Sequence, residues 1–174
     1  VTVSRGLGDV YKRQIQKLHV VGAGVMGGDI AAVAAMSGLN VSLSDVDSSA
    51  IESAINRSAN LFARRLKIDE KIAAATERLK ADPGGDHAAN ADLVIEAVAE
   101  KLSVKQAVFA DLEKIIKPGA ILATNTSAIP LEDIATALND PSRLIGLHFF
   151  NPVPVLPPVS YTHPEPTRHS DISY

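Results

Sequence analysis

The sequence predicts an α/β fold with a doubly wound, mostly parallel sheet and an inserted helical pair. Short apolar runs alternate with longer stretches of helical periodicity, as in strands joined by right-handed helical crossovers. A glycine-rich turn links the first run to a helix of small residues, which can approach a sheet closely. The helical stretch after the second run is longer than one crossover needs, which indicates the inserted pair. The predicted strands are residues 17–21, 40–44, 93–95, 121–123 and 144–147.

The predicted helices have recognisable ends. Gly38 follows the first helix as a C-cap, and Pro118 with Gly119 stops the fourth. A loop rich in Asp, Pro and Gly at residues 82–86 follows the inserted pair. The predicted helices are residues 25–37, 48–66, 71–80, 104–116 and 131–138.

Composition limits the function before any motif is considered. With 174 residues, 46% of them hydrophobic, the chain can form one domain, or one domain and a fragment. Its net charge of −3 includes no basic block, so no nucleic-acid partner is expected. No apolar run approaches the length of a membrane span. The absence of Cys excludes disulfides and Cys metal sites and fits a cytoplasmic location.

Both ends of the chain lack the patterns found in its middle. Residues 1–14 have no apolar segment of a signal peptide, and residues 159–174 show no hydrophobic face. Asp9–Gln14 can be encoded by GAT GTG TAT AAG AGA CAG, whose reverse complement encodes Val159–His163. One sequencing adapter translated in opposite orientations explains both ends, and ordinary disordered termini are the alternative. We expect residues 15–158 to be the natural domain and both ends to be non-native.

A glycine loop for a dinucleotide phosphate follows the first predicted strand. Its Gly-x-Gly-x-x-Gly spacing lies between a strand and a helix, so the helix N-terminus can bind a pyrophosphate. Asp45, after the second strand, is expected to accept hydrogen bonds from the adenosine ribose and to repel a 2′-phosphate. No Arg follows it closely, so the Rossmann-type pattern predicts NAD rather than NADP. The loop residues are Gly22, Ala23, Gly24, Val25, Met26 and Gly27.

Polar residues that could perform hydride chemistry follow the fourth and fifth predicted strands. Ser127 comes after one strand and His148 after the other, so both are expected at the carboxyl edge of the sheet. A neutral imidazole can take the proton of a secondary alcohol while its hydride leaves, and a serine can orient the same oxygen. Asn151 could fix the imidazole or the nicotinamide. From spacing alone, a buried strand-end histidine and a helix N-cap serine explain the pattern equally well.

Four stretches together make the chain resemble a known family. They resemble the NAD-binding domain of the 3-hydroxyacyl-CoA dehydrogenases of fatty-acid β-oxidation, and the resemblance covers nearly all of residues 15–158. Details near Gly28 and Pro157 are more similar to the multifunctional α-subunits than to the short monofunctional enzymes. The four stretches are Val20–Gly27, Asp92–Ala97, Ala123–Ser127 and Gly146–Val153.

The resemblance implies a role for each matching residue. It implies His148 as general acid/base and Ser127 as a hydrogen-bond donor to the substrate. It implies Asn151, Glu100 and Lys105 near the nicotinamide half of NAD. It further implies coenzyme A contacts at Ser58 and Arg65, seven residues apart and so expected on one helix face, although solvated helix residues are the alternative.

The chain departs from this family in two ways. The family has a glutamate twelve residues after its histidine that orients the ring, and here that position is Ser160. The helical C-terminal domain, which closes the cleft and forms the oligomer, is missing. The resemblance therefore implies a parent enzyme that oxidises 3-hydroxyacyl-CoA, and a chain that binds NAD with little or no activity. Another NAD-dependent β-hydroxyacid dehydrogenase and a non-catalytic NAD-binding protein are the alternatives.

Overall fold

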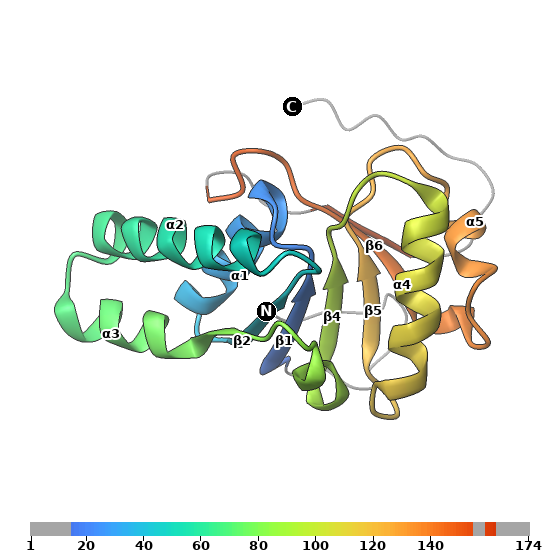
Figure 1. Ribbon diagram of the computed structural model, residues 1–174, viewed down its shortest axis with the longest axis horizontal. Coiled ribbons are helices and arrows are strands. Elements are labelled where there is room, and N and C mark those ends of the chain that lie inside the picture. The colour runs from blue at the N-terminus through green and yellow to red at the C-terminus, as the bar shows by residue number, and fades with distance from the viewer. Residues whose placement is uncertain (1–14, 155–158, 163–174) are drawn as a thin grey trace, which may run out of the picture.

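The computed structural model describes residues 15–154 and 159–162 (Figure 1). The strands there form one sheet in the order β3-β2-β1-β4-β5-β6-β7. The first six strands pair in parallel, and β7 pairs antiparallel with β6, so the expected α/β class with a doubly wound, mostly parallel sheet is confirmed. The strands are β1 (Lys17–Val21), β2 (Asn40–Ser44), β3 (Leu79–Ala81), β4 (Leu93–Glu96), β5 (Ile121–Thr124), β6 (Leu144–His148) and β7 (Val159–Thr162).

Helices cover both faces of the sheet, because successive strand side chains point to opposite faces and both faces are apolar. Leu18 and Val20 of β1 pack with the α1 and α2 side, whereas Leu122 of β5 and Leu144 of β6 pack with α4 and α5. Figure 1 shows α4 and α5 together at one side of the sheet and α2 and α3 at the other. The helices are α1 (Val25–Met36), α2 (Ser48–Leu66), α3 (Asp69–Arg78), α4 (Leu102–Ile115) and α5 (Leu131–Ala135), with short 3-10 helices η1 (Asp86–Asn90) and η2 (Pro141–Arg143).

The order of the strands places a switch point at the centre of the sheet. From β1 the chain moves outward to β2 and β3, then returns to the other side of β1 and continues outward from β4 to β6. The loops after β1 and β4 therefore leave the carboxyl edge in opposite directions and open a crevice between them. In open α/β sheets ligands bind at this crevice.

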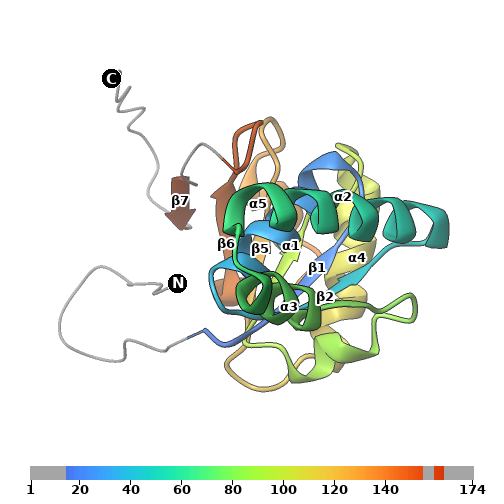
Figure 2. The same ribbon diagram turned by 90° about the vertical axis from the view of Figure 1, so that its left-hand side faces the viewer.

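The inserted pair extends sideways from the sheet (Figures 1 and 2). The chain reverses at Lys67, which has a left-handed φ of 55°, and α3 packs back along α2. The predicted helix 71–80 is wrong at its end, because residues 79–81 leave the helix and pair with β2 as an edge strand. This strand is only three residues long and its partner lies far away in sequence, so local periodicity could not reveal it.

The helix expected at residues 131–138 ends at Ala135. After it, the N–H groups of Ala137 and Leu138 donate to the carbonyl oxygens of Ile134 and Ala135, three residues earlier, and not to the residue four earlier as an α-helix requires.

The non-native segments predicted at the two ends of the chain lie largely outside the described residues. The exception is the backbone of β7, which pairs with β6 (Figure 2).

Candidate functional site

The glycine loop between β1 and α1 has three glycines with three different surroundings. Gly22 has a φ of +104°, and a Cβ there would lie 2.6 Å from the carbonyl oxygen of Ala97. A Cβ on Gly27 would lie 1.8 Å from the carbonyl oxygen of Gly22, so α1 can approach β1 only without a side chain there. A Cβ on Gly24 would meet nothing within 4 Å. The first and third glycines serve packing, and the second borders open space.

The N-terminus of α1 is open to an anion. Its N-cap, Gly24, has no side chain to accept the first free N–H groups, and the first turn carries no acidic residue. Free N–H groups and the helix dipole there favour a phosphate. Arg57 of α2 donates from Nη2 to the carbonyl oxygen of Gly24 at 3.3 Å, which places a guanidinium beside the loop. Sequence analysis missed this arginine, because it lies 33 residues along the chain from Gly24.

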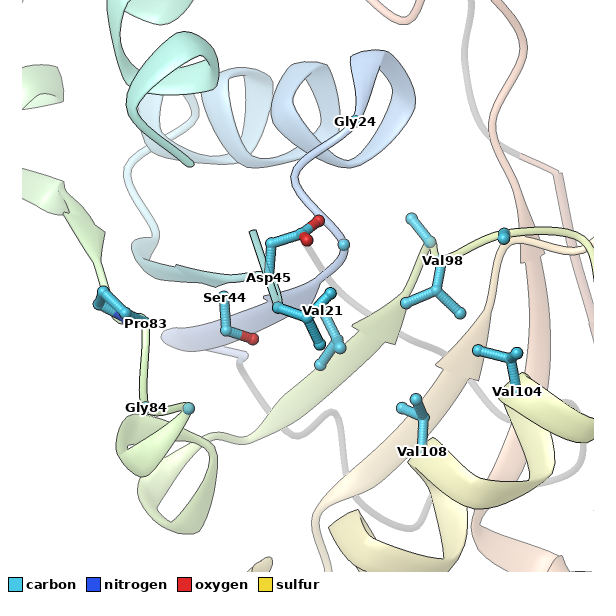
Figure 3. A pocket seen from close by; sticks show the side chains of 14 residues that line it. Val21, Gly24, Ser44, Asp45, Pro83, Gly84, Val98, Val104 and Val108 are labelled. Atoms are coloured by element: carbon cyan, nitrogen blue, oxygen red, sulfur yellow. The ribbon is translucent and has the colours of Figure 1, made fainter. Parts of the chain in front are cut away.

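A cavity of about 510 Å³ adjoins the glycine loop (Figure 3). Asp45 stands at its edge, with Oδ2 accepting from the Ala23 N–H at 2.6 Å and Oδ1 from the Asp47 N–H at 2.9 Å. Both carboxylate oxygens are thus oriented by backbone N–H groups. The other lining residues are mostly small or apolar: Val21, Gly22, Gly24, Ser44, Val46, Pro83, Gly84, Gly85, Ala97, Val98, Ala99, Val104 and Val108.

A second cavity, of about 360 Å³, contains the residues expected to perform chemistry. It shares Ala97 and Val98 with the first cavity, so the two adjoin along the loop after β4. Strand ends β4, β5 and β6 and the start of α1 all contribute to it, because parallel strands end at one edge. The lining residues are Met26, Ala97, Val98, Glu100, Lys105, Asn125, Ser127, His148, Phe149, Phe150 and Asn151.

His148, the last residue of β6, is half-buried in this cavity. Its ring lies 4.5 Å from the ring of Phe150, measured between centroids, with the planes tilted by 35°. Asn125 Oδ1 accepts the Phe149 N–H at 2.8 Å and so ties the segment after His148 to the end of β5. This contact fixes where the imidazole leaves the sheet, and sequence analysis missed Asn125 as a residue of the site.

One of the residues that line this cavity is a lysine buried between two carboxylates. Lys105 is 1% exposed, and its Nζ lies 2.7 Å from Glu96 Oε1 and 3.3 Å from Glu100 Oε2. Glu96, which is fully buried, also accepts the Val98 N–H and the Thr124 hydroxyl at 2.7 Å each. A buried charge requires such partners, since the protein interior solvates it poorly. The network joins the ends of β4 and β5 to α4.

Glu100 connects this network to the loop that carries Ser127. Its Oε1 accepts the Thr126 hydroxyl and, at 3.2 Å each, the N–H groups of Ser127 and Ala128. Burial alone would raise the pKa of the Glu100 carboxyl, but the Thr126 hydroxyl and the Lys105 ammonium outweigh burial and hold that pKa below its usual range. Glu100 is therefore a carboxylate near neutral pH. Ser127 itself is exposed and is not the N-cap of α5, which is Pro130.

The two residues suggested for coenzyme A differ in their exposure. Ser58 is buried and donates its hydroxyl to the Ala54 carbonyl oxygen at 2.7 Å, whereas Arg65 is exposed near the end of α2. Both residues lie on α2, seven positions apart, and so on one face of that helix. Ser58 is buried there because α2 packs on α1, whereas Arg65 remains open to solvent.

Among the described residues no helix is long and apolar enough to cross a membrane. Within the same part of the chain, no group of three His, Cys, Asp or Glu side chains could hold a metal ion.

Comparison with known proteins identifies one family. The family described as "3-hydroxyacyl-CoA dehydrogenase, NAD binding domain" matches residues 17–170. A "Probable 3-hydroxybutyryl-CoA dehydrogenase" of Bacillus subtilis is 38% identical over 147 residues, and the match covers 82% of this chain and 51% of that protein. A "Fatty acid oxidation complex subunit alpha" of Pseudomonas putida is 36% identical over 169 residues, and here the match covers 95% of this chain and 23% of the relative.

Solved structures agree with the sequence relatives. The crystal structure of 3-hydroxybutyryl-CoA dehydrogenase from Escherichia coli is 39% identical, with a TM-score of 0.79 over 82% of this chain and 31% of that one. The (S)-3-hydroxybutyryl-CoA dehydrogenase of Ralstonia eutropha is 34% identical, with a TM-score of 0.78 over 82% and 52%. The chain thus spans about half or less of the length of these relatives. It belongs to the 3-hydroxyacyl-CoA dehydrogenase family and is an NAD-binding domain of that family.

Proposed function

We propose that this chain is the cofactor-binding half of an enzyme that oxidises 3-hydroxyacyl-CoA to 3-oxoacyl-CoA in fatty-acid β-oxidation. The observation that carries the proposal is the second cavity, where His148, Ser127 and Asn151 gather beside the glycine loop. An acid/base and an amide from the segment at the end of β6 meet a hydroxyl from the loop after β5, and such groups can take the proton and orient the substrate during hydride transfer. Family membership and the relatives from fatty-acid oxidation support the substrate class.

The first cavity fits NAD. Its volume of about 510 Å³ suits half of a dinucleotide, and open space faces Gly24 where a pyrophosphate would lie. In this proposal Asp45 binds the adenosine ribose, while Glu100, Lys105 and Asn151 lie near the nicotinamide half. Bound NAD supplies the hydride acceptor.

His148 acts as general base in the proposed oxidation. The 3-hydroxyl proton passes to its neutral imidazole while the hydride leaves carbon 3, and the C–O bond becomes a carbonyl. The proton is later released to solvent, so one substrate yields one ketone, one reduced cofactor and one proton. Ser127 donates a hydrogen bond to the substrate oxygen. Glu100 holds the Ser127 and Ala128 N–H groups and thereby orients this loop.

Several finer features belong to the proposed parent enzyme. It is cytoplasmic, binds an acyl-CoA and forms an oligomer through a helical C-terminal domain. The coenzyme A contact at Arg65 is compatible with an exposed guanidinium, whereas Ser58 could contribute only if its buried hydroxyl moved. The parent is a multifunctional α-subunit in this proposal, in line with the Pseudomonas relative.

NAD binding by the chain itself tests the first step. Isothermal titration should give a lower Kd for NAD than for NADP, because the Asp45 carboxylate repels a 2′-phosphate. Asp45→Asn should weaken the binding of NAD and reduce the preference for NAD over NADP. Asp111→Asn, an exposed change on α4, is the control and should alter neither Kd. Equal affinity of the unmodified chain for both cofactors contradicts the role of Asp45.

Activity tests the second step. With acetoacetyl-CoA and NADH, the purified chain should show little or no turnover, because Ser160 replaces the glutamate that orients the histidine in the family. Robust turnover refutes the view that the chain is catalytically incomplete. In the full-length protein, His148→Ala should abolish the reaction. An unchanged rate there would favour a non-catalytic NAD-binding protein or a different base.

A further inference from the structure

A cluster of buried polar side chains lies beneath the larger cavity, and the proposed reaction does not use it. His19, in the middle of β1, is 1% exposed. Its Nδ1 lies 2.7 Å from Ser42 Oγ, and its Nε2 lies 3.0 Å from Ser44 Oγ, both on β2. Asp82, which is 5% exposed, places Oδ2 at 3.7 Å from His19 Nδ1. Buried polar groups destabilise a fold unless they are paired, so this cluster is a specific arrangement.

Asp82 fixes both sides of a turn. Its N–H donates to the Leu43 carbonyl oxygen on β2 at 2.9 Å, and its own carbonyl accepts the Gly85 N–H at 2.9 Å. Its Oδ2 accepts the His87 N–H at 2.9 Å and lies 3.1 Å from His87 Nδ1. The turn from Asp82 to Gly85 is thereby tied to β2 at its start and to η1 at its end.

This turn forms one wall of the cavity. Pro83, Gly84 and Gly85 line it together with Ser44, and Figure 3 shows Pro83, Gly84 and Ser44 across the opening from Val104. Gly85 has a φ of +70°, and a Cβ there would lie 4.0 Å from both His19 Nε2 and Ser44 Oγ. The imidazole therefore lies directly behind the turn and beside the Ser44 hydroxyl.

We propose that His19 and Asp82 are positioning residues for the adenosine half of NAD. The imidazole supports Ser44 and Gly85 from behind, and the carboxylate holds the turn at a fixed distance from the opposite wall. The flat adenine ring then binds between two walls that are already ordered. Binding does not have to order the turn, so the affinity for the adenosine half is higher. This inference rests on the NAD binding proposed above and extends it to residues that touch no ligand.

The test uses ADP-ribose, which carries the adenosine half and both phosphates but no nicotinamide. His19→Leu removes both ring hydrogen bonds, and Asp82→Ala removes the carboxylate. Each substitution should raise the Kd for ADP-ribose about fivefold, which corresponds to the loss of about one hydrogen bond. His19→Gln keeps a donor and an acceptor and should stay within roughly twofold of the unmodified chain. Lys80→Ala, an exposed change on β3, is the matched control and should have no effect.

Amide NMR of the ¹⁵N-labelled chain separates positioning from general damage. In His19→Leu and Asp82→Ala, saturating ADP-ribose should shift the amides of Gly84 and Gly85 less than in the unmodified chain. The amides of Gly24 and Gly27 should respond as before, because the phosphates still bind the loop. If both pairs of amides lose their response equally, the cluster supports only the fold and the inference is overturned.

The remaining outcomes are also distinct. Unchanged ADP-ribose affinity in both folded variants overturns this inference and leaves NAD binding intact. Failure of the unmodified chain to bind ADP-ribose or NAD overturns the proposed function itself. Should one of the two variants not fold, the other carries the same test, since the two changes lie on different segments.

Discussion

Removing the buried ammonium of Lys105 should destabilise the chain strongly. Lys105→Met keeps most of the side-chain volume but leaves Glu96, which is fully buried, without its cation. Breaking one partner of a buried ion pair costs about 3–5 kcal/mol, because the remaining charge is neither solvated nor compensated. The Val98 N–H and the Thr124 hydroxyl still bind Glu96, so we expect about 3 kcal/mol, the lower end of that range.

Equilibrium unfolding in urea, followed by circular dichroism, measures this loss. Lys114→Met is the matched control on the same helix, because Lys114 pairs with Asp111 at 2.9 Å while both side chains are more than 70% exposed. Exposed pairs contribute about 0–1 kcal/mol, so this variant should stay close to the unmodified chain. The double variant Glu96→Gln with Lys105→Met should recover much of the loss, because no uncompensated charge remains. A loss below about 1 kcal/mol for Lys105→Met would refute the reasoning.

Two further predictions concern stability. Burial lowers the pKa of His19 from 6.5 to about 4, although Asp82 opposes the shift. Between pH 6.5 and pH 4 the imidazole is protonated in the unfolded chain but stays neutral in the folded chain. The contribution of His19 to the free energy of unfolding is therefore complete above pH 6.5 and falls by up to about 3 kcal/mol as the pH drops toward 4. Urea midpoints at pH 5 and 7.5 should differ less in His19→Gln, and an identical pH dependence contradicts this. Gly27→Ala should lower the urea midpoint more than Gly24→Ala does, because only a Cβ on Gly27 would collide with backbone atoms. Urea midpoints in the reverse order would contradict the close packing of α1 at Gly27.

Much of the fold followed from local pattern. The strands of the sheet centre were predicted because each is a short apolar run after a turn signal, and β3 was missed because it is three residues long and depends on β2 for its pairing. The end of α5 was placed three residues too late for a similar reason. Apolar spacing continues past Ala135, but Asn139 and Asp140 donate their N–H groups to Glu113 on α4, which draws the chain away from the helix.

The sequence by itself predicted where the candidate site lies. A glycine loop after one strand, Asp45 after the next, and Ser127 and His148 after two later strands all come to the carboxyl edge, since parallel strands end on the same side. That conclusion needs only the order of the elements.

Only the tertiary structure decided how those residues are held. Lys105 lies between Glu96 and Glu100, Arg57 reaches the carbonyl of Gly24, and His19 lies behind the turn that begins at Asp82. Each is a contact of a side chain with a group on another segment of the chain, and these segments meet only through the packing of helices and strands. Burial then sets their charge state and their partners, and no local pattern in the sequence carries that information.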